Sequence, residues 1–478
     1  MSGDLHFILP EIGLLILAGV VMGLDMVLPG AARRALGWVT AAGLALLLGL
    51  AMGSALQPAG GDIFGGMLRA DTLAASFRVI LLAAAMLSVL IAMGVEGLAD
   101  RGEAYTLMLV ATLGMNLMAA AGDLVMLYLA IETTSIPLYL LAGYLKRESR
   151  STEAGLKYFL FGATASTVML YGFSLLFGFT GETRLTAVAE SIASGGMPTV
   201  LWIAAAMFVL VGFGFKVSAV PLHFWTPDVY EGAPTPITAF ISTASKAAGF
   251  AVLMRVMLTV FTPAVAPYWV GIVVAMSVAT MTLGNVVALT QKNIKRMLAY
   301  SSIAHAGYAL IGLVALSPLG VASTLFYLGA YVITNLAAFG VVIVVSRIVG
   351  SDDIAQFAGL SRRAPMVALA LLVALLSLAG MPPFVGFVAK VFVFAAAVEQ
   401  GYIWLAVVGV LNSIVGLYYY LIVLKVVYLF RSESEAQPLP VTAPYKWALG
   451  LTLLGIVVLG VLSGPWFDWA LGAAGSLF

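Results

Sequence analysis

Five ionisable residues lie well inside apolar stretches of this chain, where a charged side chain is costly. They are Glu132, Lys216, Lys246, His305 and Lys390. A lysine at the centre of a membrane helix costs on the order of 2.5–3.5 kcal/mol on insertion scales, so such residues are rare and mark ion or proton paths. The lysines outnumber the single carboxylate, so static pairing does not neutralise them all. The set therefore indicates titratable chemistry.

These residue types suit proton transfer. Burial favours the neutral form of a lysine and a nearby carboxylate favours the charged form, so a lysine–glutamate pair that can separate holds and releases a proton. Histidine titrates near neutral pH without much help. Ser301 lies one turn before His305 and Tyr308 nearly one turn after it, a spacing that offers hydroxyls to both faces of the imidazole.

Each of these residues could also have a purely structural role. A lone lysine inside a membrane can be a structural ion pair, and a lone histidine can be a satisfied core residue. We expect Arg78 and Lys425 to be interfacial or to snorkel, and Arg255 to reach the outer surface. Glu11 and Asp25, near the ends of the first apolar run, are interpreted as interfacial.

The composition limits the class of protein. Of the 478 residues, 62% are hydrophobic and only 9% are charged, whereas a soluble domain has about 25% charged residues. With no cysteine, disulfides, Cys-ligated iron–sulfur clusters and thiolate zinc sites are excluded. The near-neutral balance of 23 basic and 22 acidic residues gives no electrostatic case for nucleic acid. These features predict an all-α polytopic membrane protein.

About fourteen apolar runs are long enough to cross a bilayer as helices. They are residues 8–28, 35–56, 72–95, 104–121, 123–145, 157–179, 199–219, 236–260, 266–290, 297–315, 322–346, 366–397, 402–430 and 446–474. The first run follows no positive n-region or cleavage site, so we expect it to be a retained span. The twelfth is broken by Met381-Pro382-Pro383, and the seventh ends in a break at Pro221, so helices 7 and 12 are predicted to be discontinuous.

The basic residues give an orientation. Of the 17 Lys and Arg outside the spans, 15 fall in alternate loops, and only Arg69 and Arg184 fall in the opposite set. The positive-inside rule then predicts that both termini lie on the outer side. One missed or invented span would destroy the alternation.

The seventh and twelfth spans each contain a break and a lysine, and they lie five spans apart. This pattern predicts two five-helix units inserted with opposite topology, an architecture typical of transporters. The predicted domains are residues 1–103 (helices 1–3), 104–260 (helices 4–8), 261–430 (helices 9–13) and 431–478 (helix 14).

Three segments resemble a known family. HFWTPDVYEGAPTPITAFISTASKAAGF, NIKRMLAYSSIAHAGY and GMPPFVGFVAK are similar to the antiporter-like membrane subunits of respiratory complex I, the proton-pumping NADH:quinone oxidoreductase. The resemblance implies fourteen helices in two inverted five-helix units. It matches Glu132 to the family's fifth-helix glutamate and Lys216 to the seventh-helix lysine that pairs with it. Lys246 matches the central eighth-helix lysine, and Lys390 the twelfth-helix lysine at the exit side. His305 falls in the tenth helix of the central polar axis.

The resemblance also implies a cellular setting. It implies a multi-pass subunit of a bacterial inner membrane, surrounded by other membrane-arm subunits and lipid, that moves protons in a respiratory chain. The chain would hold no cofactor; NAD, FMN, iron–sulfur clusters and quinone are expected in partner subunits. Two alternatives remain at this point: a subunit of a multisubunit cation/proton antiporter, and a structural membrane subunit whose buried charges only fix helix register.

Overall fold

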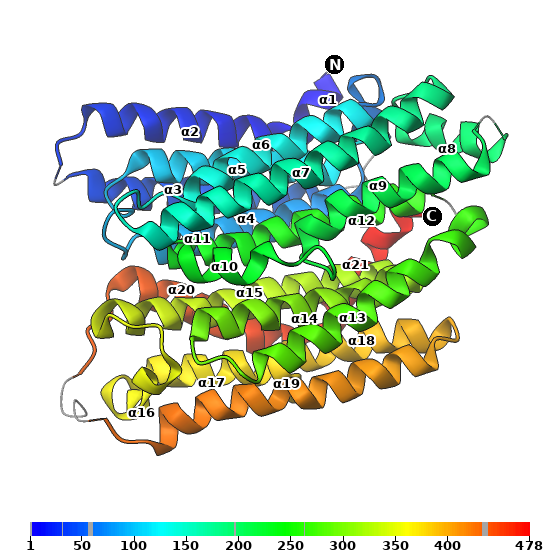
Figure 1. Ribbon diagram of the computed structural model, residues 1–478. Coiled ribbons are helices and arrows are strands. Elements are labelled where there is room, and N and C mark those ends of the chain that lie inside the picture. Colours follow the sequence, from blue (N-terminus) through cyan, green and yellow to red (C-terminus); the bar gives the residue numbers. More distant parts are fainter. Residues whose placement is uncertain (1, 31, 56–60, 196, 262, 433–437) are drawn as a thin grey trace.

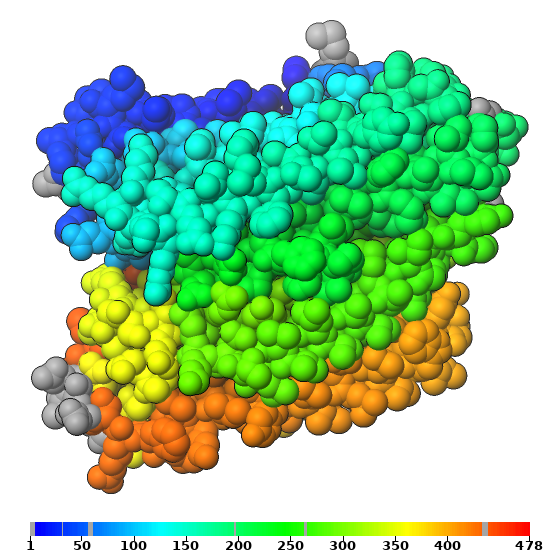
Figure 2. Space-filling view, viewed as in Figure 1, coloured from blue at the N-terminus to red at the C-terminus, as the bar shows by residue number. Residues whose placement is uncertain are grey.

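The computed structural model describes residues 2–30, 32–55, 61–195, 197–261, 263–432 and 438–478, and in this part of the chain it is a bundle of long helices that lie along a common direction (Figure 1). Thirteen helices within these residues are long and apolar enough to cross a membrane. The twelfth predicted run forms two shorter helices, so it completes the expected set of about fourteen spans. The space-filling view shows one continuous body (Figure 2).

The N-terminal third begins with helices that flank a small hairpin. These elements are α1 (Ser2–Phe7), α2 (Leu9–Val27), α3 (Ala35–Ala55), the antiparallel strands β1 (Asp62–Ile63) and β2 (Leu68–Arg69), and α4 (Thr72–Ala92). The next elements are α5 (Gly102–Ala120), α6 (Leu124–Ala142), α7 (Ser149–Thr180), α8 (Leu185–Ala193), α9 (Thr199–Val217), α10 (Trp225–Gly232), α11 (Thr235–Phe240), a π-helical turn (Ile241–Ser245) and α12 (Lys246–Thr259).

The second half of the chain repeats this pattern of long spans. It contains α13 (Val270–Ala288), α14 (Ile294–Val314), α15 (Pro318–Val349), α16 (Leu360–Arg363), α17 (Pro365–Ala379), α18 (Val385–Glu399), α19 (Ile403–Leu429), α20 (Ala443–Val461) and α21 (Ser463–Ala474). In Figure 1, α5–α12 occupy the upper half of the view and α13–α19 the lower half.

Side chains placed by the sequence define several helix ends. The carboxylate of Asp123 accepts hydrogen bonds from the first amides of α6, and the side chain of Asn293 does the same for α14. Gly181 and Gly350 end α7 and α15 in the left-handed conformation, at φ 70° and 75°, where glycine carries no steric penalty.

Several landmarks of the first half recur at a fixed spacing in the second. Positions 149, 181 and 184 in the first half match 318, 350 and 353 in the second, a constant separation of 169 residues, and α7 and α15 both have 32 residues. The loop before α6 exchanges two backbone hydrogen bonds with the segment after α7, and the loop before α14 does so with the segment after α15. The ranges 104–260 and 261–430 enclose α5–α12 and α13–α19, apart from the first two residues of α5.

The burial of the spans identifies the centre of the bundle. The span from Thr235 to Thr259 is wholly buried, and α14 and α15 nearly so, whereas α2 and α20 are mostly exposed. A helix that is hydrophobic all round belongs inside a bundle, and the exposed apolar side chains of the outer helices suit contact with lipid. The central helices therefore bring Lys246 and His305 to the most buried part of the molecule.

The predicted helix breaks are present in the structure. Helix α9 ends directly after Lys216, and the chain resumes helical structure only at Trp225. The twelfth run divides into α17 and α18, separated by residues 380–384, where Gly380 has φ 88°. Since each break frees carbonyls and amides in the middle of an apolar bundle, both breaks create places where polar side chains bind backbone.

Candidate functional site

The structure places the five predicted residues on five different elements. Glu132 lies in the middle of α6, Lys216 in the last turn of α9, Lys246 at the first residue of α12, His305 in the middle of α14 and Lys390 in α18. The three lysines and the histidine are buried, and Glu132 is half-buried. Lys216 is thus at a helix end rather than at mid-helix, because the chain breaks just after it.

In the first group, serine hydroxyls separate the lysine from the carboxylate. Lys216 Nζ donates to Ser135 Oγ at 2.7 Å, and Ser166 Oγ donates to the carboxylate of Glu132. No ion pair between Lys216 and Glu132 occurs in the part of the chain that the structure describes. The implied direct pair is therefore replaced here by two hydroxyl contacts. Ser135, Ser166 and Lys216 line one cavity of about 10 Å³, close to the smallest volume that holds a water molecule.

Indole and aromatic contacts support the end of α9. The carbonyl of Phe215, next to Lys216, accepts a 3.1 Å hydrogen bond from Trp225 Nε1. The Trp225 ring stacks on Tyr158 with centroids 4.5 Å apart. The Phe215 carbonyl also accepts from the backbone amide of Ser218, so the indole adds a second hydrogen bond at the end of the helix. This bond fixes α10 against the lysine-bearing end of α9.

Lys246 binds neutral oxygens of one residue. Its Nζ donates to the carbonyl of Ser302 at 2.7 Å and to the Ser302 hydroxyl at 2.5 Å. Tyr331 donates to the same hydroxyl at 2.8 Å, and Tyr230 lies 3.4 Å from it. Ser302 therefore joins the central lysine to two tyrosines.

His305 is bonded on both ring nitrogens. Nδ1 lies 2.6 Å from the hydroxyl of Tyr327, and Nε2 lies 3.3 Å from that of Tyr420. The expectation that Ser301 and Tyr308 would contact the imidazole with their hydroxyls is wrong. Ser301 bonds to the Tyr420 hydroxyl instead, and Tyr308 presents its ring edge to His305 while its hydroxyl accepts from Asn285.

Lys390 binds the broken end of α17. Its Nζ donates to the carbonyls of Leu378 and Ala379 at 3.1 and 3.0 Å and lies 4.8 Å from the centre of the Tyr308 ring. The C-terminal end of a helix carries partial negative charge and unpaired carbonyls, so it stabilises a cation there. A side-chain methyl at Gly380 would lie 2.9 Å from the Lys390 stem, which explains the glycine in the break.

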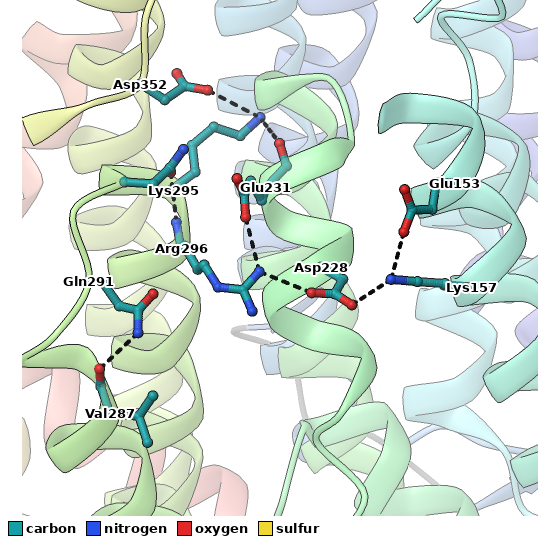
Figure 3. A network of polar contacts seen from close by, with 10 residues as sticks. Glu153, Lys157, Asp228, Glu231, Val287, Gln291, Lys295, Arg296 and Asp352 are labelled. Atoms are coloured by element: carbon teal, nitrogen blue, oxygen red, sulfur yellow. Dashed lines mark hydrogen bonds and ion pairs between the residues drawn. The ribbon is translucent and has the colours of Figure 1, made fainter. Parts of the chain in front are cut away.

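A network of charges at the ends of α7, α10 and α14 joins the two halves (Figure 3). Asp228 pairs with Lys157 of α7 at 2.7 Å and with Arg296 of α14 at 3.0 Å, and Arg296 also pairs with Glu231. Lys295, buried nearby, donates to the carbonyls of Glu231 and Ala233. Partial burial of Asp228 opposes ionisation, but the hydrogen bonds from Lys157 and Arg296 outweigh it and lower the pKa of this carboxyl.

Asp228, Glu231, Lys295 and Arg296 have a structural role that was not predicted from the sequence. The structure places all four in contacts that hold α10 between the two halves.

The buried arginines behave differently from the lysines. Arg78 is 1% exposed and pairs with Glu11 at 2.8 Å, and Arg255 is 1% exposed and binds Asp71 through two hydrogen bonds of 2.6 and 2.9 Å. The expectation of interfacial positions for Arg78, Arg255 and Glu11 is therefore wrong, since helix packing brings each arginine to a carboxylate. Lys425 is exposed, as expected of an interfacial residue.

Sequence reasoning missed most of the hydroxyl partners. Ser302, Tyr327, Tyr331 and Tyr420 each contact a predicted residue or its immediate partner. A signal was present, because these are polar side chains inside long apolar runs. Which one meets which lysine or histidine depends on packing between helices that are distant in sequence.

Comparison with known proteins gives consistent results. Residues 121–416 match the family described as NADH:quinone oxidoreductase/Mrp antiporter, TM. The NADH-quinone oxidoreductase subunit N of Moorella thermoacetica is 42% identical over 477 residues, 99% of each chain. That of Chlorobium chlorochromatii is 40% identical, over 98% of this chain and 94% of the relative.

Solved structures share the fold. A chain of respiratory complex I from Thermus thermophilus with bound Aureothin has a TM-score of 0.80 and 34% identity, over 96% of this chain and 99% of the other. A chain of the Mrp complex from Dietzia sp. DQ12-45-1b has a TM-score of 0.87 over 99% of this chain and 97% of the other, at 22% identity, which is a likeness of fold alone.

Proposed function

The chain belongs to the family of NADH:quinone oxidoreductase and Mrp antiporter membrane proteins, and on this premise we propose that it serves as a proton-translocating, antiporter-like subunit of the subunit N type in complex I. The relatives at 40–42% identity over nearly the whole chain are named subunit N. The sequence WTPDVYEGAP at residues 225–234 resembles this subunit type more than its sister subunits. The proton moves through Glu132, Lys216, Lys246, His305 and Lys390.

One observation carries the relay: three buried lysines bind neutral oxygens, while two buried arginines are ion-paired. A lysine that donates to a serine or a carbonyl can lose its proton without leaving a carboxylate unpaired. A buried arginine stays charged and needs its partner. The lysines are therefore the groups that can change charge during a transport cycle.

These contacts support an order of transfer. Lys216 Nζ donates to Ser135, Ser166 donates to the Glu132 carboxylate, and Ser135, Ser166 and Lys216 line one small cavity, so a proton held at Lys216 responds to the charge at Glu132. The Ser302 hydroxyl accepts from both Lys246 and Tyr331, so a proton that leaves Lys246 enters this hydroxyl and moves on once the Tyr331 hydroxyl turns to accept it. His305, between Tyr327 and Tyr420, relays it toward Lys390. Hydroxyls and intervening waters connect such groups in proton relays.

The cellular setting follows from the family and the loop charges. We place the chain in the bacterial inner membrane with both termini on the outer side, so that the network of Figure 3 faces the cytoplasm. NAD, FMN, iron–sulfur clusters and quinone belong to partner subunits, and quinone reduction there drives the charge shifts along this chain's axis.

The test compares Lys216→Ala with Lys425→Ala in inverted membrane vesicles. NADH:quinone turnover and proton uptake are followed together, and assembly is checked on native gels. We expect Lys216→Ala to lose both activities by about 100-fold, the scale of a lost proton-transfer group, with the complex assembled. The exposed Lys425 variant should match the wild type.

Other outcomes select the alternatives. Normal pumping in Lys216→Ala would make this lysine a structural cation, and loss of assembly would favour a purely structural subunit. If this chain does not co-purify with iron–sulfur and flavin subunits, a cation/proton antiporter replaces complex I as its assembly.

A further inference from the structure

A groove of about 1170 Å³ opens between the ends of α2, α5, α6 and α7. It is separate from the small cavities beside Lys216 and His305, and none of its residues takes part in the proposed relay. Its mouth lies where the loops carry most of the basic residues. We propose that this groove binds one diacyl phospholipid with an anionic headgroup.

The mouth of the groove is basic. Arg101 precedes α5, and Lys146 and Arg147 lie in the loop between α6 and α7. None of the three forms an ion pair with another described residue. Two acids, Glu103 and Glu148, also line the groove, so the three basic residues exceed the acids by one charge. Glu103 already accepts a 2.8 Å hydrogen bond from Tyr144. Arginine and lysine donors at this level suit a lipid phosphate.

The deeper walls are apolar. Ile136 and Leu140 of α6 and Leu156 and Phe159 of α7 line the groove and are each at least 50% exposed. Polar groups at the mouth and apolar groups below match an amphiphile aligned with the helices.

The depth of the groove selects a lipid over a protein helix. From Tyr144 beside the mouth to Ile136 in α6 is eight residues within the fifth predicted span, or about 12 Å at the helical rise. This is somewhat less than half of the roughly 30 Å hydrocarbon core. One leaflet of lipid has this depth, whereas a neighbouring transmembrane helix would need a groove across the whole membrane.

The position of the groove gives the bound lipid a consequence. Tyr139 lines the groove and also lines the small cavity that contains Ser135 and Lys216. Acyl chains in the groove therefore cover the outer side of this tyrosine and keep water from the Lys216 cavity. This sealing role rests on the proposed function; the binding of lipid does not.

The test uses the intact membrane complex in lipid nanodiscs that contain a trace of photoactivatable phosphatidylglycerol with a diazirine on one acyl chain. Adducts are mapped by mass spectrometry of peptides. We expect adducts on residues 136–159 that fall at least about tenfold in the Arg101→Gln/Lys146→Gln/Arg147→Gln variant. The matched control is Lys292→Gln/Arg431→Gln/Lys446→Gln, which removes the same charge elsewhere on the same face and should keep the adducts.

A second measurement needs no variant. In the wild-type complex, unlabelled phosphatidylglycerol should compete with the probe at least about tenfold better than diacylglycerol with the same chains. Equal competition would overturn the proposal, as would equal labelling of the two triple variants. Adducts on a neighbouring subunit in place of residues 136–159 would show that protein covers the groove. Because pumping is not the readout, failure of the relay leaves these results unchanged.

Discussion

The two five-helix halves share their framework but differ in what surrounds each lysine. Counted from the helix caps Asp123 and Asn293, Glu132 in α6 and Ser302 in α14 occupy the same position, and so do Ser135 and His305. In the first half, Lys216 meets Ser135 one turn from a carboxylate. In the second, Lys390 meets only carbonyls and an aromatic ring.

This difference assigns distinct tasks to similar scaffolds. A carboxylate near a lysine changes the cost of its charge when the distance between them changes, so the first half is suited to respond to an external signal. The second half has Ser302 and His305 where the first has Glu132 and Ser135, and its histidine is bonded to two tyrosines, so it is suited to pass a proton onward. The central Lys246 belongs to the first half by sequence but binds Ser302 of the second.

The last helix of each half differs as well. The span that ends in α12 is wholly buried and carries Arg255, which binds Asp71, whereas α19 is buried over only about 39% of its span and carries Lys425 at its surface. The first half is therefore fixed to the N-terminal helices by a buried ion pair, and the second is not fixed in this way.

The largest expected effect comes from breaking that ion pair. Arg255→Met leaves the buried Asp71 without its two guanidinium hydrogen bonds and with only the more distant Arg69, at 3.9 Å, as a cationic neighbour among the described residues. Losing the partner of a buried charge costs up to about 3–5 kcal/mol and should lower the melting temperature of the purified complex. Lys425→Met at the surface of α19 is the matched control and should leave it unchanged. Adding Asp71→Asn should restore part of the loss. If the Arg255→Met and Lys425→Met complexes have the same melting temperature, the buried ion pair of the first half does not contribute to stability.

Next in size is the loss of the exit lysine. Lys390→Met removes the amine that binds the freed carbonyls at the break between α17 and α18, and proton uptake by inverted vesicles should fall about 100-fold. NADH-driven turnover should fall with it if the halves act in series. Normal uptake in this variant would mean that the second half is not needed for transport.

A smaller effect separates the two matching positions 132 and 302. Glu132→Gln removes the carboxylate near Lys216, and Ser302→Ala removes the hydroxyl that accepts from Lys246. Each substitution removes an interaction with a charged group, worth about 1.5–3 kcal/mol. We expect proton uptake to fall about tenfold or more in both variants. At position 302, the conservative variant Ser302→Thr keeps the hydroxyl and should retain the proton uptake that Ser302→Ala loses. Glu132→Gln with normal stoichiometry would refute the link between Glu132 and Lys216.

The smallest effect concerns the network that joins the halves. Asp228 has a pKa below its ordinary value of 3.8 in the folded protein, so it adds stability above about pH 4 that is lost as the pH falls through the lower folded pKa. Asp228→Asn should cost about 0.2–1 kcal/mol for each partly exposed ion pair at pH 7. The difference in stability between variant and wild type should shrink as the pH falls below about 4. A difference that does not shrink with falling pH would not come from the carboxylate charge.

The sequence alone determined the spans, the helix breaks and the identities of five titratable residues inside the spans. Each of these depends on local properties: the length of an apolar run, a proline that cannot continue a helix, or a charged residue in a run that otherwise excludes charge. For this reason the break at Pro382 and the five titratable residues could be predicted from the sequence alone.

The tertiary structure decided which partner each charge meets. Ser135 and Lys216 are 81 residues apart, Lys246 and Ser302 are 56 apart, and His305 and Tyr420 are 115 apart. Many serines and tyrosines in the chain are chemically equivalent, so only the packing of the helices selects among them. For the same reason the sequence misplaced Arg78 and Arg255: a charge in an apolar run has a fixed cost, but whether a carboxylate on another helix offsets it depends on the fold.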